Sequence, residues 1–273
     1  MFPPFLPISR TKLAQMPAPL RLGTVLAIVG VLWLPLGLPI LWLVPDPDWQ
    51  SILGLGLGYG GFVGVVRWWG KTVAGRSHPL EHYGLRLASF RVPWFQGLVL
   101  GCAIVFGLYL LQGVLGWVTW QSPAENFGWI ALEGLALAAG LGFAEELLFR
   151  GWLLGELQQD YGIQRAIVLS SLVFAVAHFL KPWSEVWRTL PQFPGLLLLG
   201  LILSQAKAIH LGRSMGLHSG LVWGYYLIKV GKLAVQNDRI LPWISGVDGN
   251  PLAGLLGIGL LSVWYIKGKR SVS

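Results

Sequence analysis

The sequence predicts an all-α membrane protein, a polytopic bundle of about eight transmembrane helices. Only 12% of its 273 residues are charged, against about 25% in a typical soluble domain, and the mean hydropathy is +0.62. The 37 glycines and 15 tryptophans fit this class, since Gly is frequent in membrane helices and Trp gathers at membrane interfaces. These observations exclude a soluble enzyme, a disordered protein and a fibrous protein.

Eight apolar segments mark the predicted helices. A spanning helix needs about 20 mostly apolar residues, and a helix satisfies its own backbone hydrogen bonds in lipid. The segments do not alternate in polarity as the strands of a membrane β-barrel do. The predicted helices cover residues 22–44, 51–66, 95–119, 127–149, 166–180, 193–211, 214–230 and 251–266.

The second segment, 51–66, is rich in glycine, which predicts close helix packing. It does not resemble a phosphate-binding loop, because no Gly-Lys-Ser/Thr follows it. The loop at 67–91 carries basic residues and is predicted to face lipid headgroups in the cytoplasm. The single cysteine, Cys102, lies in an apolar run and cannot form a disulfide within the chain.

The distribution of Lys and Arg predicts that both termini are cytoplasmic. With that orientation, 15 of the 20 basic residues lie on the inner side and 5 on the outer side, which follows the positive-inside rule. The membrane is predicted to be a bacterial plasma membrane or a thylakoid-like membrane. The net charge of +8 is attributed to anionic membrane lipid, with no nucleic acid as a partner.

A few ionisable residues interrupt the apolar segments of the second half. Placing such a group at the bilayer centre costs about 2.5–3.5 kcal/mol on insertion scales, so it is a functional candidate by default. Glu133 and His210 are weaker candidates, because each lies near a segment end. The strongest candidates are Glu145, Glu146, Arg150, His178 and His218.

Helical spacing separates the roles of the two glutamates. Glu146 and Arg150 are four residues apart, the spacing of an ion pair. Glu145 lies about 100° around the helix, which leaves it the freer carboxylate and suits it to act as a general base. A bundle can bring this carboxylate together with His178 and His218 from two other helices, where they could activate water directly or hold a metal. A buried ion pair and buried histidines can also be purely structural.

The three motifs, taken in order, resemble the CPBP family of intramembrane proteases. This family includes the CAAX prenyl endopeptidases and the bacteriocin-processing and self-immunity (Abi) proteins. The residues that match are Glu145-Glu146-x-x-x-Arg150, Phe174-x-x-x-His178 and His218, on three separate predicted helices. The resemblance covers about residues 127–230 and implies a CAAX-protease-like core.

The resemblance implies a role for each matching residue. Glu145 and His178 would activate the attacking water, and His218 would stabilise the oxyanion of the tetrahedral intermediate. Glu146, Arg150 and Phe174 would support the site. The chain would then divide into N-terminal membrane helices (1–120), a catalytic core (121–235), and a last helix with a basic tail (236–273). Its partners would be membrane lipid and a membrane-associated, prenylated or leader peptide.

The sequence leaves three questions open: the effect of Val222, the choice between protease and transporter, and metal dependence. The family commonly has an Asn four residues after the last His, and Val222 stands there instead. Val222 favours an alternative function, a non-catalytic peptide-binding or self-immunity protein. A proton-coupled transporter is a further alternative, although no internal repeat is evident.

Metal dependence is the third of these questions. The zinc signature H-E-x-x-H is absent, and the absence of a tightly bound metal is favoured. If zinc is present, its ligands would be Glu145, His178 and His218.

The predicted helix ends conflict with the predicted site. Taken literally, they place Glu145 and His178 at different depths in the membrane. We therefore expect the fourth helix to continue through Trp152 and Leu153, and the fifth helix to run past Leu180.

Overall fold

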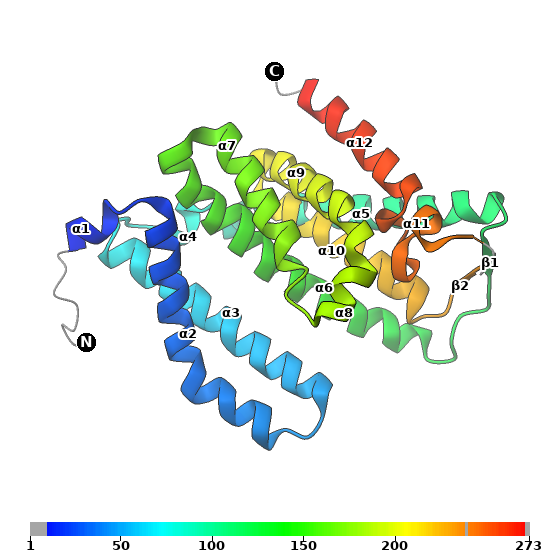
Figure 1. Cartoon of the computed structure of the whole chain (residues 1–273), viewed down its shortest axis with the longest axis horizontal. Helices are drawn as coiled ribbons and strands as arrows, with labels where there is room; N and C mark the ends of the chain where they lie inside the picture. The colour runs from blue at the N-terminus through cyan, green and yellow to red at the C-terminus, as the bar shows by residue number, and fades with distance from the viewer. Residues whose placement is uncertain (1–9, 238–239, 271–273) are drawn as a thin grey trace. The chain divides into compact units, whose positions relative to one another are not determined.

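The computed structural model describes residues 10–237 and 240–270, and this part of the chain is predominantly helical (Figure 1). The described strands are β1 (Val118–Trp120) and β2 (Ala234–Gln236), which form one short antiparallel pair with Thr119 opposite Val235. The predicted all-α class is therefore confirmed. The chain ends, at 1–9 and 271–273, lie outside the described residues, and the cytoplasmic location of both termini stays a prediction.

The chain forms two compact units. The first combines the described residues up to Gly84 with Gly155–Gly162, and the second combines Leu85–Leu154 with the described residues from Ile163 onward. These units are defined by packing, whereas the predicted division at 120 and 235 concerns function and stays a prediction.

The first unit is built on two long helices. Its helices are α1 (Arg10–Ala14), α2 (Ala18–Leu43), α3 (Pro47–Thr72) and α4 (Pro79–His82). The Asp46 side chain caps α3 by accepting hydrogen bonds from the backbone N–H groups of Asp48 and Trp49.

The glycine-rich helix α3 packs through one aromatic side chain. The Trp33 indole of α2 donates to the Gly54 carbonyl at 2.9 Å and lies beside Gly58. An added Cβ at Gly56 or Gly60 would meet no described atom within 4 Å. At Gly54 and Gly58 an added Cβ would meet Trp33 only at ordinary van der Waals distances of 3.8 and 3.5 Å, so the described structure does not show the close packing predicted for the glycines of 51–66.

A buried ionic network joins α2, the residues on either side of α4 and the Gly155–Gly162 segment inside the first unit. Glu156 accepts hydrogen bonds from Arg21 Nε at 2.8 Å, Tyr83 Oη at 2.6 Å and Arg76 Nη1 at 3.2 Å. Burial, reinforced by the Glu156 carboxylate, raises the pKa of Tyr83 above its usual value. The network offsets the cost of burying a carboxylate by supplying it with several donors.

The second unit contains the remaining helices. The larger ones are α5 (Arg91–Val114), α6 (Phe127–Glu146), α7 (Leu154–Ala177, whose residues 155–162 belong to the first unit), α9 (Phe193–Ile209), α10 (Leu211–Lys229) and α12 (Leu255–Arg270). The shorter ones are α8 (Trp183–Thr189), α11 (Pro242–Ser245), the π-helix Leu147–Leu153, and 3₁₀ turns at Leu87–Ser89, Leu190–Gln192, Val247–Gly249 and Pro251–Ala253.

One of the two predicted helix extensions is confirmed and the other is wrong. The fourth helix continues through Trp152 and Leu153, because a π-helical segment links α6 to α7 without a break. It ends near Gly162, whose φ of 72° and ψ of 165° lie outside the helical region. The fifth helix does not run past Leu180: it ends at Ala177. Pro182 only sets an outer limit to this helix, because it has no N–H to donate and disfavours a helical conformation at Lys181.

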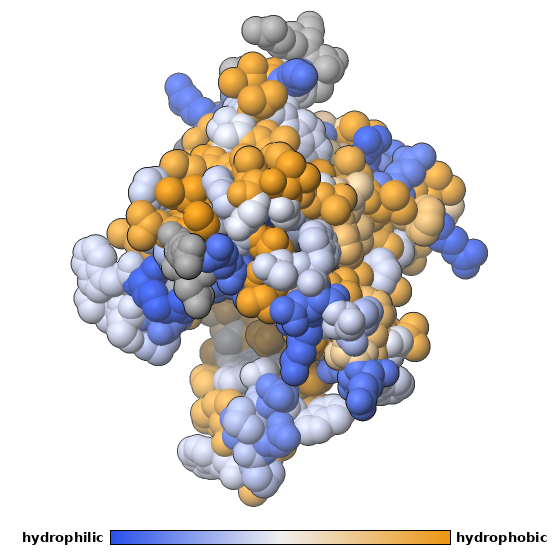
Figure 2. Space-filling view, turned by 90° about the vertical axis from the view of Figure 1, so that its right-hand side faces the viewer, coloured by the Kyte–Doolittle hydropathy of each residue, from blue (hydrophilic) through white to orange (hydrophobic). Residues whose placement is uncertain are grey.

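All eight predicted apolar segments overlap helices, although 95–119 runs past the end of α5 at Val114 into β1. Five helices are long and apolar enough to cross a membrane by length and composition. These five are Ala18–Leu43, Pro47–Thr72, Arg91–Val114, Phe127–Tyr161 and Trp183–Ile209, and two shorter apolar helices cover Ile163–Ala177 and Leu255–Gly268. Large hydrophobic side chains remain exposed on several of them, and Figure 2 shows hydrophobic residues over much of the visible surface. Such a surface suits a lipid environment.

Helices α5 and α10 approach each other until their backbones touch. An added Cβ at Gly97 or Gly101 of α5 would collide with the backbone of α10. From the other side, Gly216 and Gly220 of α10 lie directly against the α5 backbone. Small residues at four-residue spacing permit this approach in membrane helices. The glycines therefore determine where α10 lies in the second unit.

We predict that Gly101→Ala destabilises the protein while Gly107→Ala does not. A methyl group at Gly101 would lie 2.6 Å from Leu221 N, and overpacking of this kind typically costs about 1–3 kcal/mol. Gly107 is on the same helix with no described atom within 4 Å of an added Cβ. Thermal unfolding of the two purified variants in detergent measures the difference, and equal midpoints would contradict the proposed role of the close contact.

Candidate active site

The two adjacent glutamates end helix α6 where it approaches α10. Glu145 and Glu146 are the last residues of α6, and the π-helix begins at Leu147. One turn earlier, an added Cβ at Gly142 would lie 2.8 Å from the Met215 carbonyl of α10, so only glycine allows α6 to come this close. Short π-helical segments occur frequently at functional sites.

Glu146 and Arg150 form the predicted ion pair. Arg150 Nη1 donates to Glu146 Oε1 at 2.8 Å, and neither side chain has any exposed surface. The guanidinium also stacks on the Phe174 ring, with its Cζ atom 4.0 Å from the ring centroid, a cation–π contact. Arg150 therefore joins the π-helical segment to Glu146 at the end of α6 and to Phe174 of α7.

His218, from α10, completes the cluster around Glu146. Its Nδ1 lies 2.9 Å from Glu146 Oε1. An ionised carboxylate only accepts hydrogen bonds, so His218 donates through Nδ1–H. The other ring nitrogen, Nε2, lies 3.9 Å from Glu145 Oε2. His218 therefore binds Glu146 through Nδ1, and its Nε2 points toward Glu145.

His178 is the C-cap residue of α7. Its Nδ1 lies 2.8 Å from the Phe174 carbonyl. Because a carbonyl oxygen only accepts hydrogen bonds, Nδ1 carries the proton and the neutral ring has its lone pair on Nε2. Among the described residues no hydrogen bond or ion pair joins His178 to Glu145.

Phe174 connects the two histidines. It is fully buried, and its ring centroid lies 4.6 Å from that of His178 and 6.0 Å from that of His218. Phe149 packs edge-on against the same ring at 5.3 Å. Phe174 therefore holds the imidazoles of α7 and α10 beside one aromatic surface.

Glu145 is the carboxylate with an unused oxygen. Its Oε2 atom is buried and has no hydrogen-bond partner among the described residues. Buried polar atoms in proteins are nearly always paired, so an unpaired one requires an explanation. Glu146, by contrast, is bound by Arg150, His218 and Ser214. The two glutamates therefore differ in their contacts: Glu146 has three partners, whereas Glu145 keeps an oxygen free to accept a hydrogen bond.

The site does not form a three-ligand metal centre. Within residues 10–237 and 240–270, no group of three His, Cys, Asp or Glu side chains lies close enough to hold a metal ion. A catalytic zinc site needs three such ligands around one position. Glu145, His178 and His218 therefore do not fit a zinc ion in this arrangement.

Sequence reasoning missed two features of this cluster. The first is the bond from His218 to Glu146, because the sequence analysis gives Glu146 only a supporting role. The second is Ser214, whose Oγ lies 2.5 Å from Glu146 Oε2. The spacing contained a signal, because Ser214 and His218 are four residues apart and share one face of α10.

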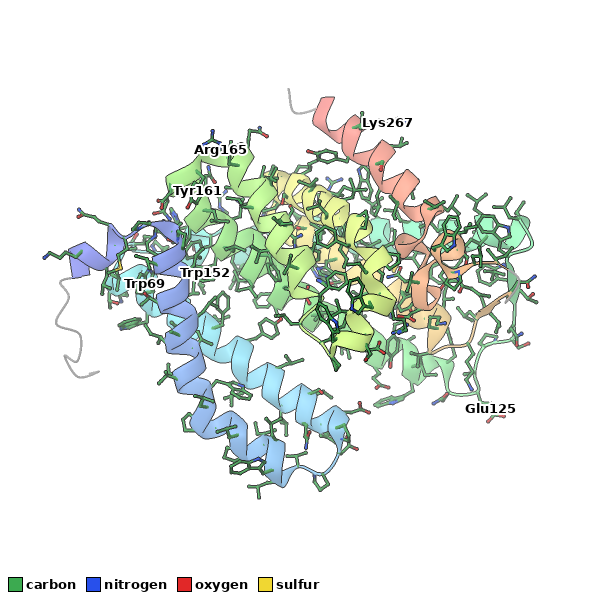
Figure 3. All side chains as sticks on the ribbon, in the orientation of Figure 1. Trp69, Glu125, Trp152, Tyr161, Arg165 and Lys267 are labelled. Atoms are coloured by element: carbon green, nitrogen blue, oxygen red, sulfur yellow. The ribbon has the colours of Figure 1, made fainter. Side chains whose placement is uncertain are left out.

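The weaker candidates, His210 and Glu133, take other roles, and Trp152 of the π-helix is buried. His210 caps α10 by accepting from Gly212 N at 2.9 Å, and its Nε2 contacts Ser89 Oγ at 3.0 Å. Glu133 is exposed on α6 and hydrogen-bonds to Tyr226. Trp152, labelled in Figure 3, is buried in the π-helical segment.

Fold and site together define an α-helical membrane protein with a buried carboxylate–imidazole cluster, and comparison with known families agrees. Residues 126–236 match the family model described as type II CAAX prenyl endopeptidase Rce1-like. No curated protein and no solved structure matches the chain. The matched segment contains every candidate site residue, and it confirms the predicted resemblance to the CPBP family. At this level the match supports a protease in an integral membrane protein.

We predict that Arg150→Met destabilises the fold strongly. The change leaves the Glu146 carboxylate buried without its cation, and breaking a buried pair in this way costs about 3–5 kcal/mol. Arg188→Met is the matched control, because Arg188 pairs with Glu185 and Asp248 on the exposed surface, where ion pairs contribute little. Unfolding of both variants in a detergent titration measures this difference, and a small effect of Arg150→Met would contradict it.

Proposed function

We propose that the protein is an intramembrane endopeptidase that hydrolyses peptide bonds of membrane-associated peptides with a water activated by Glu145 and histidine. One observation carries the proposal. Glu145 Oε2 is buried without a hydrogen-bond partner among the described residues, and it faces His218 Nε2 at 3.9 Å. A water or substrate oxygen can bond to both atoms at ordinary hydrogen-bond lengths of about 2.8 Å. Residues 121–235, which contain the cluster, would form the catalytic core.

Glu145 is assigned as the general base because it is the carboxylate with free acceptor capacity. It takes a proton from water while the water oxygen attacks the carbonyl carbon of the scissile bond. His178 Nε2 accepts the second water proton in a hydrogen bond and orients the attacking lone pair. Glu145 then passes its proton to the leaving amine as the C–N bond breaks. General acid–base catalysis of this kind contributes about 10²–10⁴-fold to a rate.

His218 is assigned to the oxyanion. With Nδ1–H bound to Glu146, a doubly protonated His218 presents Nε2–H to the developing negative charge. A preorganised donor in a dry site contributes about 10²–10³-fold to a rate. Glu146 stabilises the charged ring, so it acts through His218 as well as through its ion pair with Arg150.

We predict that Glu145→Gln and His178→Ala each reduce peptide cleavage by about 10²-fold or more, because each removes a group that activates water. Glu133→Gln is the matched control, since Glu133 lies on the same helix but is exposed and bonded to Tyr226. Comparing membrane peptides from cells that express each form identifies the substrate as the uncut peptide that accumulates. The proposal fails if Glu145, His178 and His218 can all be replaced without changing any peptide.

A second candidate, a non-catalytic peptide-binding or self-immunity protein, is favoured by Val222. Val222 lies one turn beyond His218 on α10, at the position where the family commonly has Asn. Valine cannot donate a hydrogen bond to an oxyanion. A pocket of this kind could hold a peptide without cutting it.

The variant Val222→Asn distinguishes the two functions. If the protein is a protease that lacks a second oxyanion donor, the added amide should raise kcat by about 10-fold or more. Turnover of a farnesylated, internally quenched CAAX peptide by protein in liposomes measures this. A binding protein would retain the peptide without turnover in both the wild type and the variant.

The remaining assignments belong to the same proposal. The substrates would be prenylated CAAX tails or leader peptides that enter from membrane lipid. The protein would lie in a bacterial plasma or thylakoid-like membrane with both termini in the cytoplasm, and it would work without a tightly bound metal.

A further inference from the structure

Ser214 contacts two hydrogen-bond acceptors, the Glu146 carboxylate and a backbone carbonyl of α9. Its side chain is fully buried on α10. Ser214 Oγ lies 2.5 Å from Glu146 Oε2 and 2.9 Å from the Leu203 carbonyl of α9. A hydroxyl has one proton, and hydrogen bonds to a charged acceptor are shorter and stronger. The short contact therefore indicates that Ser214 donates to Glu146.

This bond fixes the orientation of the Glu146 carboxylate. Its Oε1 atom binds both Arg150 and His218. Its Oε2 atom has Ser214 as its hydrogen-bond donor in the described structure. Because the two oxygens are rigidly joined, holding Oε2 also fixes the direction in which Oε1 meets His218 Nδ1.

We propose that Ser214 is a positioning residue for His218 that acts through Glu146. It keeps Glu146 ionised and keeps its carboxylate in the plane that directs His218 Nε2 toward Glu145. This inference rests on the proposed function and deepens it. The Leu203 carbonyl gives the hydroxyl a second acceptor, so when Glu146 takes up a proton Ser214 can turn and accept a hydrogen bond from it.

The test compares Ser214→Ala with Ser219→Ala. Both serines are fully buried on α10, but Ser219 donates to the Met215 carbonyl at 2.8 Å and does not bond to Glu146. The full-length protein in liposomes is assayed with a farnesylated, internally quenched CAAX peptide across a range of pH. Ser214→Thr retains the hydroxyl, and Ser214→Cys retains the volume with a weaker donor.

We expect Ser214→Ala to lower kcat by about 10-fold without changing KM, because a hydrogen bond to a charged group is lost. A carboxylate that loses a donor holds its proton more tightly, so the acid limb of the kcat/KM profile should move up by roughly one pH unit. Ser219→Ala should keep the wild-type profile, Ser214→Thr should restore it, and Ser214→Cys should lie between. A wild-type profile for Ser214→Ala, or an equal loss in Ser219→Ala, overturns the proposal.

A second measurement does not depend on turnover. Nitrogen chemical shifts of ¹⁵N-labelled histidine report which ring nitrogen of His218 carries a proton. The wild type and Ser219→Ala should show His218 with a proton on both ring nitrogens, as the proposed oxyanion role requires, and Ser214→Ala should show a mixture with a neutral form. An unchanged spectrum refutes the role of Ser214. If no form of the protein cleaves a peptide, the proposed function fails, while the spectrum still decides the role of Ser214.

Discussion

The buried carboxylate of Glu146 is the interaction on which the rest of the site depends. It has no exposed surface, and it is bound by Arg150, His218 and Ser214. An ionised carboxylate is tolerated in such a place only when donors replace its water shell. Because these donors come from the π-helix and from α10, satisfying one charge joins the elements that carry the site and leaves Glu145 as the carboxylate with a free oxygen.

A second constraint, close helix approach, places α10 where Glu146 can reach it. Glycines on α5 and α10 bring the two backbones into contact, and Gly142 does the same for α6. A bilayer supplies little hydrophobic force between helices, so backbone approach and packing must provide their association. His218 and Ser214 lie on α10, the helix that these glycines hold in place. The chemistry of the site therefore depends on residues that take no part in it.

Much of this architecture is predictable because membrane insertion leaves a strong pattern in a sequence. Apolar segments coincide with helices, and the Glu146–Arg150 pair follows from a spacing of four on one helix. The end of α7 differs from the prediction, since the apolar pattern continues through Phe179 and Leu180 whereas the helix ends at Ala177. The bonds from His218 and Ser214 to Glu146 were not predicted, because residues on different helices carry no shared periodicity.

The sequence by itself determined the class of the protein, its helices and the few polar residues inside them. The reason is energetic: a charge in an apolar segment is costly, so each one is conspicuous. Only the tertiary structure decided which partner each of these residues has. It assigned the shared oxygen of Glu146 to Arg150 and His218, and it placed Glu145 beside the far nitrogen of His218. Those choices depend on how closely separate helices approach, and that distance is set by packing in three dimensions.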